Sequence, residues 1–79
     1  MVVGIDIGSL TAKAVILNHG DVLAAHIMRV RPRPVESAEA VLAEVLNAVG
    51  ARASDIRACC ATGYGRLDIP FATMNMSEI

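Results

Sequence analysis

GIDIGSLTAK, residues 4–13 of the chain, is an apolar strand that carries an acid and then breaks at a glycine. Asp6 lies between two isoleucines, and burying an acid among apolar residues is costly unless it is paired or binds a cation. Gly8 has no β-carbon, so a bulky anion can approach the backbone there. The stretch therefore predicts a strand, a tight turn and a returning strand, with an anion site at the turn.

The residues after the break supply groups that suit a phosphate. Ser9 and Thr11 offer hydroxyls, the amides of a tight turn can point at phosphate oxygens, and Lys13 adds a positive charge. With Asp6 as a carboxylate for hydrated magnesium, the set is typical of a nucleotide phosphate site. An ordinary hairpin with a capped turn fits the spacing equally well. The Walker pattern is absent, and a strand after the turn excludes the Rossmann pattern.

Three apolar runs open the chain, at Val2–Ile7, Ala12–Leu17 and Val22–Val30. Asn18 and Gly20 are expected to supply the left-handed backbone of a tight hairpin between the last two runs. The first segment is therefore predicted to be an antiparallel meander of three strands.

A helix is predicted at Ser37–Val49, after an extended exit at Arg31–Pro34. Ser37 is the expected N-cap, and Gly50 lies where a left-handed glycine ends a helix. One apolar stripe at helical spacing indicates core packing. The stripe consists of Val41, Leu42, Val45, Leu46 and Val49.

A turn at Ser54-Asp55 and a fourth strand at Ile56–Thr62 follow, and a glycine-rich loop at Gly63–Arg66 ends that strand. Because a helix joins the third and fourth strands, the fourth is expected to lie parallel within the sheet. The fold class is therefore α/β, with the meander first. Leu67–Ile79 receives no assignment.

Composition limits the function. Hydrophobic residues make up 54% of the 79 residues, which predicts strands buried on both faces and a core that needs more layers or a partner. The net charge of −1 argues against nucleic acid as a partner, and the basic cluster of Arg29, Arg31 and Arg33 is interpreted as a solvated strand exit.

No apolar run reaches the length of a membrane span, and no basic segment precedes the first strand as in a signal peptide. The adjacent Cys59 and Cys60 lack the spacing of a zinc site. They are interpreted as reduced core thiols of a cytoplasmic protein.

Three motifs carry a resemblance to a known family. Asp6–Lys13 (DIGSLTAK) resembles the first phosphate motif of the superfamily that holds actin, sugar kinases and heat-shock chaperone ATPases. More narrowly, Gly4–Leu17 is similar to the start of the BadF/BadG/BcrA/BcrD ATPases. These activate 2-hydroxyacyl-CoA dehydratases or serve benzoyl-CoA reductases. Ala61–Arg66 (ATGYGR) and Met76–Ile79 (MSEI) resemble two further stretches of that family, so the resemblance spans essentially the whole chain.

The resemblance implies an incomplete amino-terminal lobe of the ribonuclease H-like fold, formed by residues 1–79. It implies ATP bound through Gly8, Ser9, Thr11 and Lys13, with Mg²⁺ held through water by Asp6. In the complete family protein, a homodimer, two lobes clamp ATP. Its hydrolysis drives a low-potential electron from a 4Fe-4S cluster toward a 2-hydroxyacyl-CoA dehydratase or benzoyl-CoA reductase component.

The chain also departs from the family. Leu10 and Ala12 replace residues that usually carry hydroxyls, which is expected to thin the phosphate shell, that is, to leave fewer hydrogen-bonding groups around the phosphate. The second phosphate motif, the adenosine-binding glycines and the cluster cysteines are absent, and Cys59 and Cys60 match no cluster position. The isolated chain is therefore expected to lack ATPase activity and to need a carboxyl-terminal lobe or second subunit.

Two other functions remain open at this stage. The chain could be a fragment of a sugar or acetate kinase, although ATGYGR argues against it, or a non-catalytic module that pairs with a separate second half. No catalytic residue can be assigned. Tyr64, Arg66 and Glu78 are candidate contacts of undecided role, and the glycines Gly63 and Gly65 either bring their loop close to the nucleotide or only form a turn.

Overall fold

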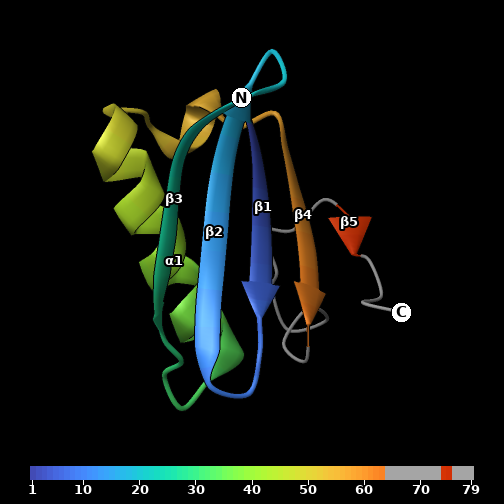
Figure 1. Cartoon of the computed structure of the whole chain (residues 1–79), viewed down its shortest axis with the longest axis vertical. Helices are drawn as coiled ribbons and strands as arrows, with labels where there is room; N and C mark the ends of the chain where they lie inside the picture. The colour runs from blue at the N-terminus through green and yellow to red at the C-terminus, as the bar shows by residue number, and fades with distance from the viewer. Residues whose placement is uncertain (64–73, 76–79) are drawn as a thin grey trace.

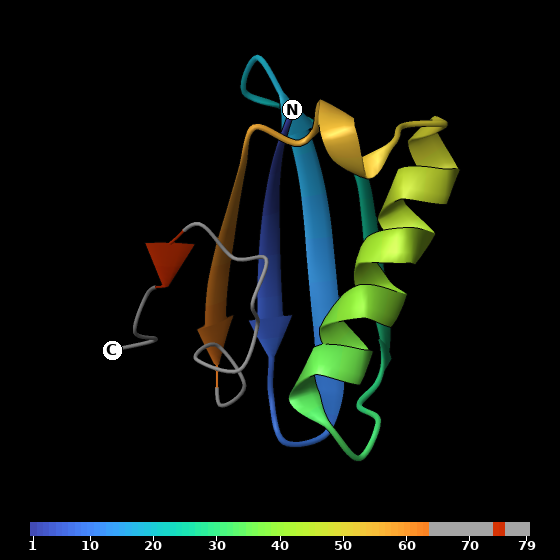
Figure 2. The same cartoon turned by 180° about the vertical axis from the view of Figure 1, so that it is seen from behind.

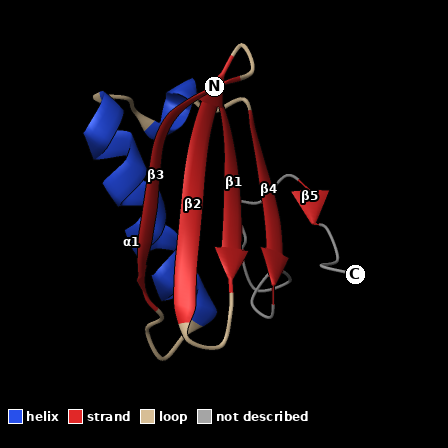
Figure 3. Cartoon of the chain, in the orientation of Figure 1, coloured by secondary structure: helices blue, strands red, loops and turns tan. Residues whose placement is uncertain are grey.

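The computed structural model describes residues 1–63 together with Met74 and Asn75. Figure 3 shows its strands and helices. The elements are, in order, β1 (Val2–Ile7), β2 (Thr11–Asn18), β3 (Asp21–Arg29), α1 (Pro34–Val49), the 3₁₀ turn η1 (Ala53–Asp55), β4 (Ala58–Gly63) and β5 (Met74–Asn75).

The strands form one mixed sheet in the order β3-β2-β1-β4-β5 (Figure 1). β1 pairs antiparallel with β2 and parallel with β4, while β2 pairs antiparallel with β3. The predicted meander, helix and parallel strand are therefore confirmed. β4 begins two residues later than predicted, because residues 53–55 form η1 before the chain enters the sheet.

The turn between β2 and β3 is tight, as predicted, but a different residue takes the left-handed backbone. His19 has φ 52° and Gly20 has φ 83°, so both central residues are left-handed, as a type I′ hairpin requires. The assignment of that role to Asn18 was wrong, because Asn18 is the last residue of β2.

Helix α1 begins at Pro34, three residues before the predicted start. A proline suits the first helical position because its missing N–H would be unsatisfied there anyway. Ser37 is therefore not the N-cap. That position belongs to Arg33, which makes no side-chain capping bond, whereas the buried Ser37 Oγ accepts a 2.7 Å hydrogen bond from the Arg31 amide. Gly50, with φ 68°, ends the helix as predicted.

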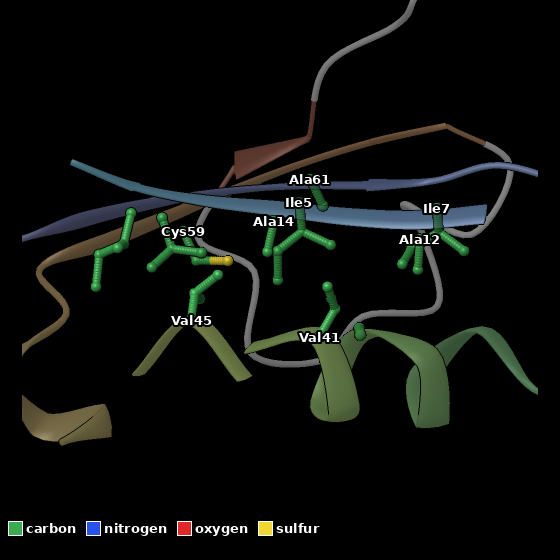
Figure 4. Close-up of a cluster of buried hydrophobic side chains, with 11 residues drawn as sticks. Ile5, Ile7, Ala12, Ala14, Val41, Val45, Cys59 and Ala61 are labelled. Carbon is green, nitrogen blue, oxygen red and sulfur yellow. The ribbon is translucent and has the colours of Figure 1, made fainter. Parts of the chain in front are cut away.

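The core lies between α1 and one face of the sheet (Figure 4). Alternate residues of β1 and β2 point at the helix, from which Val41 and Val45 point back toward them. Several of the buried residues are alanines, which let the helix lie close to the strands. The core consists of Val3, Ile5, Ile7, Ala12, Ala14, Ile16, Ala38, Val41, Val45, Cys59 and Ala61.

The opposite face of the sheet, called the open face below, is not covered by any element among residues 1–63 and 74–75. Figure 2 shows α1 on a single side, packed over β2 and β3. Burial of the strands on both faces, by further layers or a partner as the composition suggests, therefore stays a prediction. Exposed apolar side chains lie on β3, at the edge of the sheet, where Val22 and Ile27 are each 62% exposed.

The two cysteines lie on opposite faces, because successive strand residues alternate. Cys59 is buried under α1, as predicted, whereas Cys60 is half-buried and lines a hollow on the open face. Burial raises the pKa of the Cys59 thiol, and the neighbouring Cys60 adds to that effect. A higher pKa means a smaller thiolate fraction at neutral pH, and hence lower reactivity.

Replacing Ser37 with alanine should destabilise the fold. The Arg31 amide would lose its acceptor in a part-buried position, which costs about 1–3 kcal/mol. Ser54→Ala is the control, because Ser54 is exposed and such changes stay within about 0.5 kcal/mol. Urea unfolding followed by circular dichroism measures both. Equal midpoints for the two variants would contradict the bonding role of Ser37.

The cysteines should differ in alkylation rate. In the folded chain at neutral pH, iodoacetamide is expected to modify Cys60 well before Cys59, and the rate at Cys59 should climb only as alkaline pH forms its thiolate. Mass spectrometry of Cys59→Ser and Cys60→Ser variants separates the two rates. Urea-unfolded chains serve as the control and should lose the difference. Equal alkylation rates in the folded chains would contradict the placement of the two thiols on opposite faces of the sheet.

Candidate functional site

Four features meet at one end of the sheet. β1 and β4 run parallel, so their carboxyl ends lie together, and the β1–β2 turn closes the same end (Figure 1). Helix α1 also begins there (Figure 2). A helix start carries partial positive charge, and its free amides suit anions. The end of the sheet that holds GIDIGSLTAK is thus electrostatically suited to a negative ligand.

Asp6 lies on the open face, one residue before the end of β1. It is half-buried, and its Oδ1 atom is buried without a hydrogen-bond partner in the described part of the chain. Strand register places Lys13 of β2 on one side of it and Thr62 of β4 on the other. All three residues line the hollow on the open face. A carboxylate, an ammonium and a hydroxyl are thus gathered in one row.

Lys13 keeps its charge available. It is exposed and lies opposite Asp6 in the register of β1 and β2. Within residues 1–63 and 74–75, the only ion pair within 4.0 Å joins Arg33 and Glu36. Lys13 therefore stands outside any salt bridge of this region, and its ammonium can meet an anion.

The turn itself is built from Gly8, Ser9 and Leu10. The Gly8 amide donates a 2.9 Å hydrogen bond to the Thr11 carbonyl oxygen, so it is occupied within the hairpin. A β-carbon at Gly8 would lie 3.3 Å from that oxygen, which explains a glycine at this close approach. The amides of Ser9 and Leu10 donate no backbone hydrogen bond inside the described ranges. These two amides are the ones that remain for an outside acceptor.

The two departures at the hairpin differ in their consequence. Leu10 is 77% exposed at the tip of the turn, where a hydroxyl could have faced a ligand. Ala12, in contrast, is fully buried and faces α1. The expectation that Ala12 thins the phosphate shell was wrong, because a hydroxyl at this position would point into the core. Ser9 is exposed and Thr11 half-buried, so their hydroxyls are not enclosed by the core.

Sequence reasoning missed two residues near this row. Thr62 is the direct parallel neighbour of Asp6, and its place within ATGYGR was the available signal. Arg29 is exposed, as predicted, but it pairs in register with Thr11 and so lies beside the hairpin. The Val30 amide donates a 3.0 Å hydrogen bond to the Leu10 carbonyl oxygen, which joins this strand exit to the turn.

Four candidates named from the sequence, Tyr64, Gly65, Arg66 and Glu78, lie outside the described residues, as does the MSEI segment. Among the described residues, no group of three or more histidine, cysteine or acidic side chains could hold a metal ion. No helix of that part is long and apolar enough to cross a membrane.

The donor set at Asp6 nevertheless fits magnesium. Mg²⁺ keeps several of its waters and is usually bound through one or two carboxylates together with substrate phosphates. Asp6 supplies one such carboxylate, with an unpaired oxygen, and Thr62 supplies a hydroxyl in the same row. The cysteines do not fit an iron–sulfur cluster, because Cys59 and Cys60 point to opposite faces of the sheet and cannot both bind one cluster.

Known proteins resemble this chain along its length. The model of the BadF/BadG/BcrA/BcrD ATPase family matches residues 3–78. The activator of lactoyl-CoA dehydratase from Anaerotignum propionicum is 38% identical over 77 residues, which cover 96% of this chain. The match spans only 29% of that relative's length.

Two solved structures share the fold at a TM-score of 0.88 and 32% identity, each covering 98% of this chain. One is the activator of the 2-hydroxyisocaproyl-CoA dehydratase from Clostridium difficile with bound ADPNP, of which 29% is covered. The other is component A of the (R)-2-hydroxyglutaryl-CoA dehydratase from Acidaminococcus fermentans, of which 30% is covered. The chain therefore belongs to the BadF/BadG/BcrA/BcrD ATPase family, and its sheet and helix have the fold of actin-like ATPases.

Proposed function

We propose that this chain forms one wall of the ATP site in an activator of a 2-hydroxyacyl-CoA dehydratase. The observation that carries the proposal is the row of Thr62, Asp6 and Lys13 beside the β1–β2 turn. It is supported by the similar activator that was solved with ADPNP, an analogue of ATP. Residues 1–79 are, in this proposal, part of the amino-terminal lobe of a larger ATPase.

Each group at the turn has a distinct role in the proposal. Asp6 holds hydrated Mg²⁺ through a water, and that cation neutralises charge on the phosphates when it is bound. Lys13 contributes a point charge to the phosphates. Gly8 keeps the backbone bare, while Ser9 and Thr11 offer hydroxyls and the free turn amides offer donors.

The remainder of the site is proposed to come from residues outside this chain. The chain covers 29% of the curated relative, so the second wall is proposed to be a further lobe or a second subunit. ATP hydrolysis between the walls is proposed to drive a low-potential electron toward a 2-hydroxyacyl-CoA dehydratase or benzoyl-CoA reductase component. A homodimer is proposed to carry the 4Fe-4S cluster on ligands other than Cys59 and Cys60. The reduced thiols of these cysteines favour the cytoplasm as its location.

Asp6→Asn should remove the magnesium dependence of ATP binding. The carboxylate charge that orders the hydrated cation is lost, and the loss of such a water-mediated contact lowers affinity by about tenfold or more. Titration of the labelled 79-residue chain with ATP, with and without Mg²⁺, followed by NMR, measures this. Asp21→Asn is the matched control, since Asp21 is exposed at the opposite hairpin. An unchanged magnesium dependence in Asp6→Asn would refute the proposed role.

The chain by itself is expected not to turn ATP over. One wall can bind phosphates, but it cannot enclose them, and positioning and electrostatic stabilisation from both sides supply most of the rate in phosphoryl transfer. A phosphate-release assay on the purified chain tests this. Robust magnesium-dependent release that Asp6→Asn abolishes would show that the chain needs no second wall.

A further inference from the structure

Gly63 ends β4 with a backbone conformation that other residues rarely adopt. Its φ is 89°, in the left-handed region that favours glycine. In the parallel register it pairs with Ile7, so it lies one residue beyond the partner of Asp6. The glycine is buried, and it stands where the strand leaves the sheet next to the candidate site. Its position thus combines an unusual dihedral angle with close packing.

Gly63 differs from the other left-handed glycines in the room that its surroundings leave for a β-carbon. A β-carbon at Gly63 would lie 2.6 Å from Asp6 Oδ1 and would overlap the carbonyl oxygen of Ile7. At Gly20 and Gly50, which also have positive φ, a β-carbon would meet no atom within 4 Å. The dihedral angle alone therefore does not account for Gly63. Its bare α-carbon leaves room for two neighbours at once, the Ile7 carbonyl group and the Asp6 carboxylate.

The carboxylate shows the result of this contact. Oδ1 is the one buried side-chain oxygen or nitrogen of the described residues that has no hydrogen-bond partner. A buried acceptor without a partner costs free energy, and Oδ1 can lie in this position only because Gly63 places no β-carbon there. With Oδ1 enclosed beside β4, Oδ2 is the oxygen that remains for a ligand on the open face.

We propose that Gly63 is a positioning residue for Asp6. By presenting hydrogen in place of a β-carbon, it seats Oδ1 against the end of β4 and directs Oδ2 toward the open face, where hydrated Mg²⁺ would be held. This inference rests on the proposed function for its ligand. The first glycine of ATGYGR thus acts on Asp6 of the neighbouring strand β1, and this role does not depend on the loop that follows β4.

Gly63→Ala in the full 79-residue chain tests the proposal, with Gly20→Ala as the matched control. Both variants place a β-carbon on a left-handed residue, but only the first meets the Asp6 carboxylate and the adjoining Ile7 carbonyl group. The first readout needs no ligand. It is the ¹³C chemical shift of the Asp6 carboxyl carbon, which should move in Gly63→Ala and stay unchanged in Gly20→Ala. Urea unfolding of both variants measures the strain separately.

The second readout is binding of Mn²⁺ with ATP, detected by paramagnetic broadening of amide signals in β1. Gly63→Ala should weaken this binding by about tenfold, the usual scale for loss of a group that orients a metal contact. Gly20→Ala should bind as the parent chain does. If Gly63→Ala fails to fold, Gly63→Asn replaces it, because asparagine tolerates positive φ better and still carries a β-carbon.

The two readouts distinguish this proposal from the one on which it rests. A displaced carboxyl signal in a chain that does not bind Mn²⁺ with ATP would support the positioning and refute the nucleotide site. An Asp6 signal and an affinity that both match the parent chain in the folded Gly63 variant would overturn the positioning role itself.

Discussion

The parallel pairing of β1 with β4 is the constraint on which the site depends. It sets Thr62 beside Asp6 and Gly63 beside Ile7, although these residues are more than fifty positions apart in the chain. The antiparallel pairing with β2 fixes Lys13 on the other side. A slip of one residue in either pairing would turn the slipped strand's side chains to the opposite face and remove Lys13 or Thr62 from the row. Register, more than any single contact, therefore defines which groups meet.

The alternation of the strands also separates stability from binding. The buried residues of β1 and β2 face α1, and the row around Asp6 faces away from it. Ala12 and Lys13 are neighbours in sequence, yet one packs under the helix and the other is exposed. The core can therefore be made of small and branched apolar residues without regard to the chemistry on the other side. The sheet acts as a rigid support whose two faces are specified independently.

Much of this could be predicted from local patterns. The three-stranded meander, the crossover helix and Gly50 at its end follow from apolar runs, turn residues and helical spacing. The helix start could not be placed, because Ser37 has the chemistry of a cap but is used by the Arg31 amide in the tertiary structure. Two preferences applied to this segment, serine as an N-cap and proline at the first helical position, and the structure follows the second.

The site was predicted less completely than the fold. Asp6 and Lys13 were recognisable because they lie in one short segment, whereas Thr62 joins them only through the pairing of strands distant in sequence. The direction of Ala12 follows from strand alternation, but the resemblance to hydroxyl-bearing relatives suggested otherwise. Composition indicated that the core needs further layers, but it could not say which face of the sheet this chain leaves uncovered, because it reports how much apolar surface a chain has and not which elements cover it.

Strand β3 has one further consequence, for how the chain behaves at high concentration. It is the first strand of the sheet order, so its outer backbone groups have no strand partner among the described residues. Val22, Leu23 and Ile27 are exposed along it, and no proline interrupts it, although its register against β2 shifts between Ile16 and Leu17. Such an edge is a template for strands of other molecules, and natural proteins usually protect it with charge, bulges or a covering segment. β3, at the side of the sheet away from the β1–β4 pair, is therefore the edge of the described sheet that presents apolar side chains to a further strand.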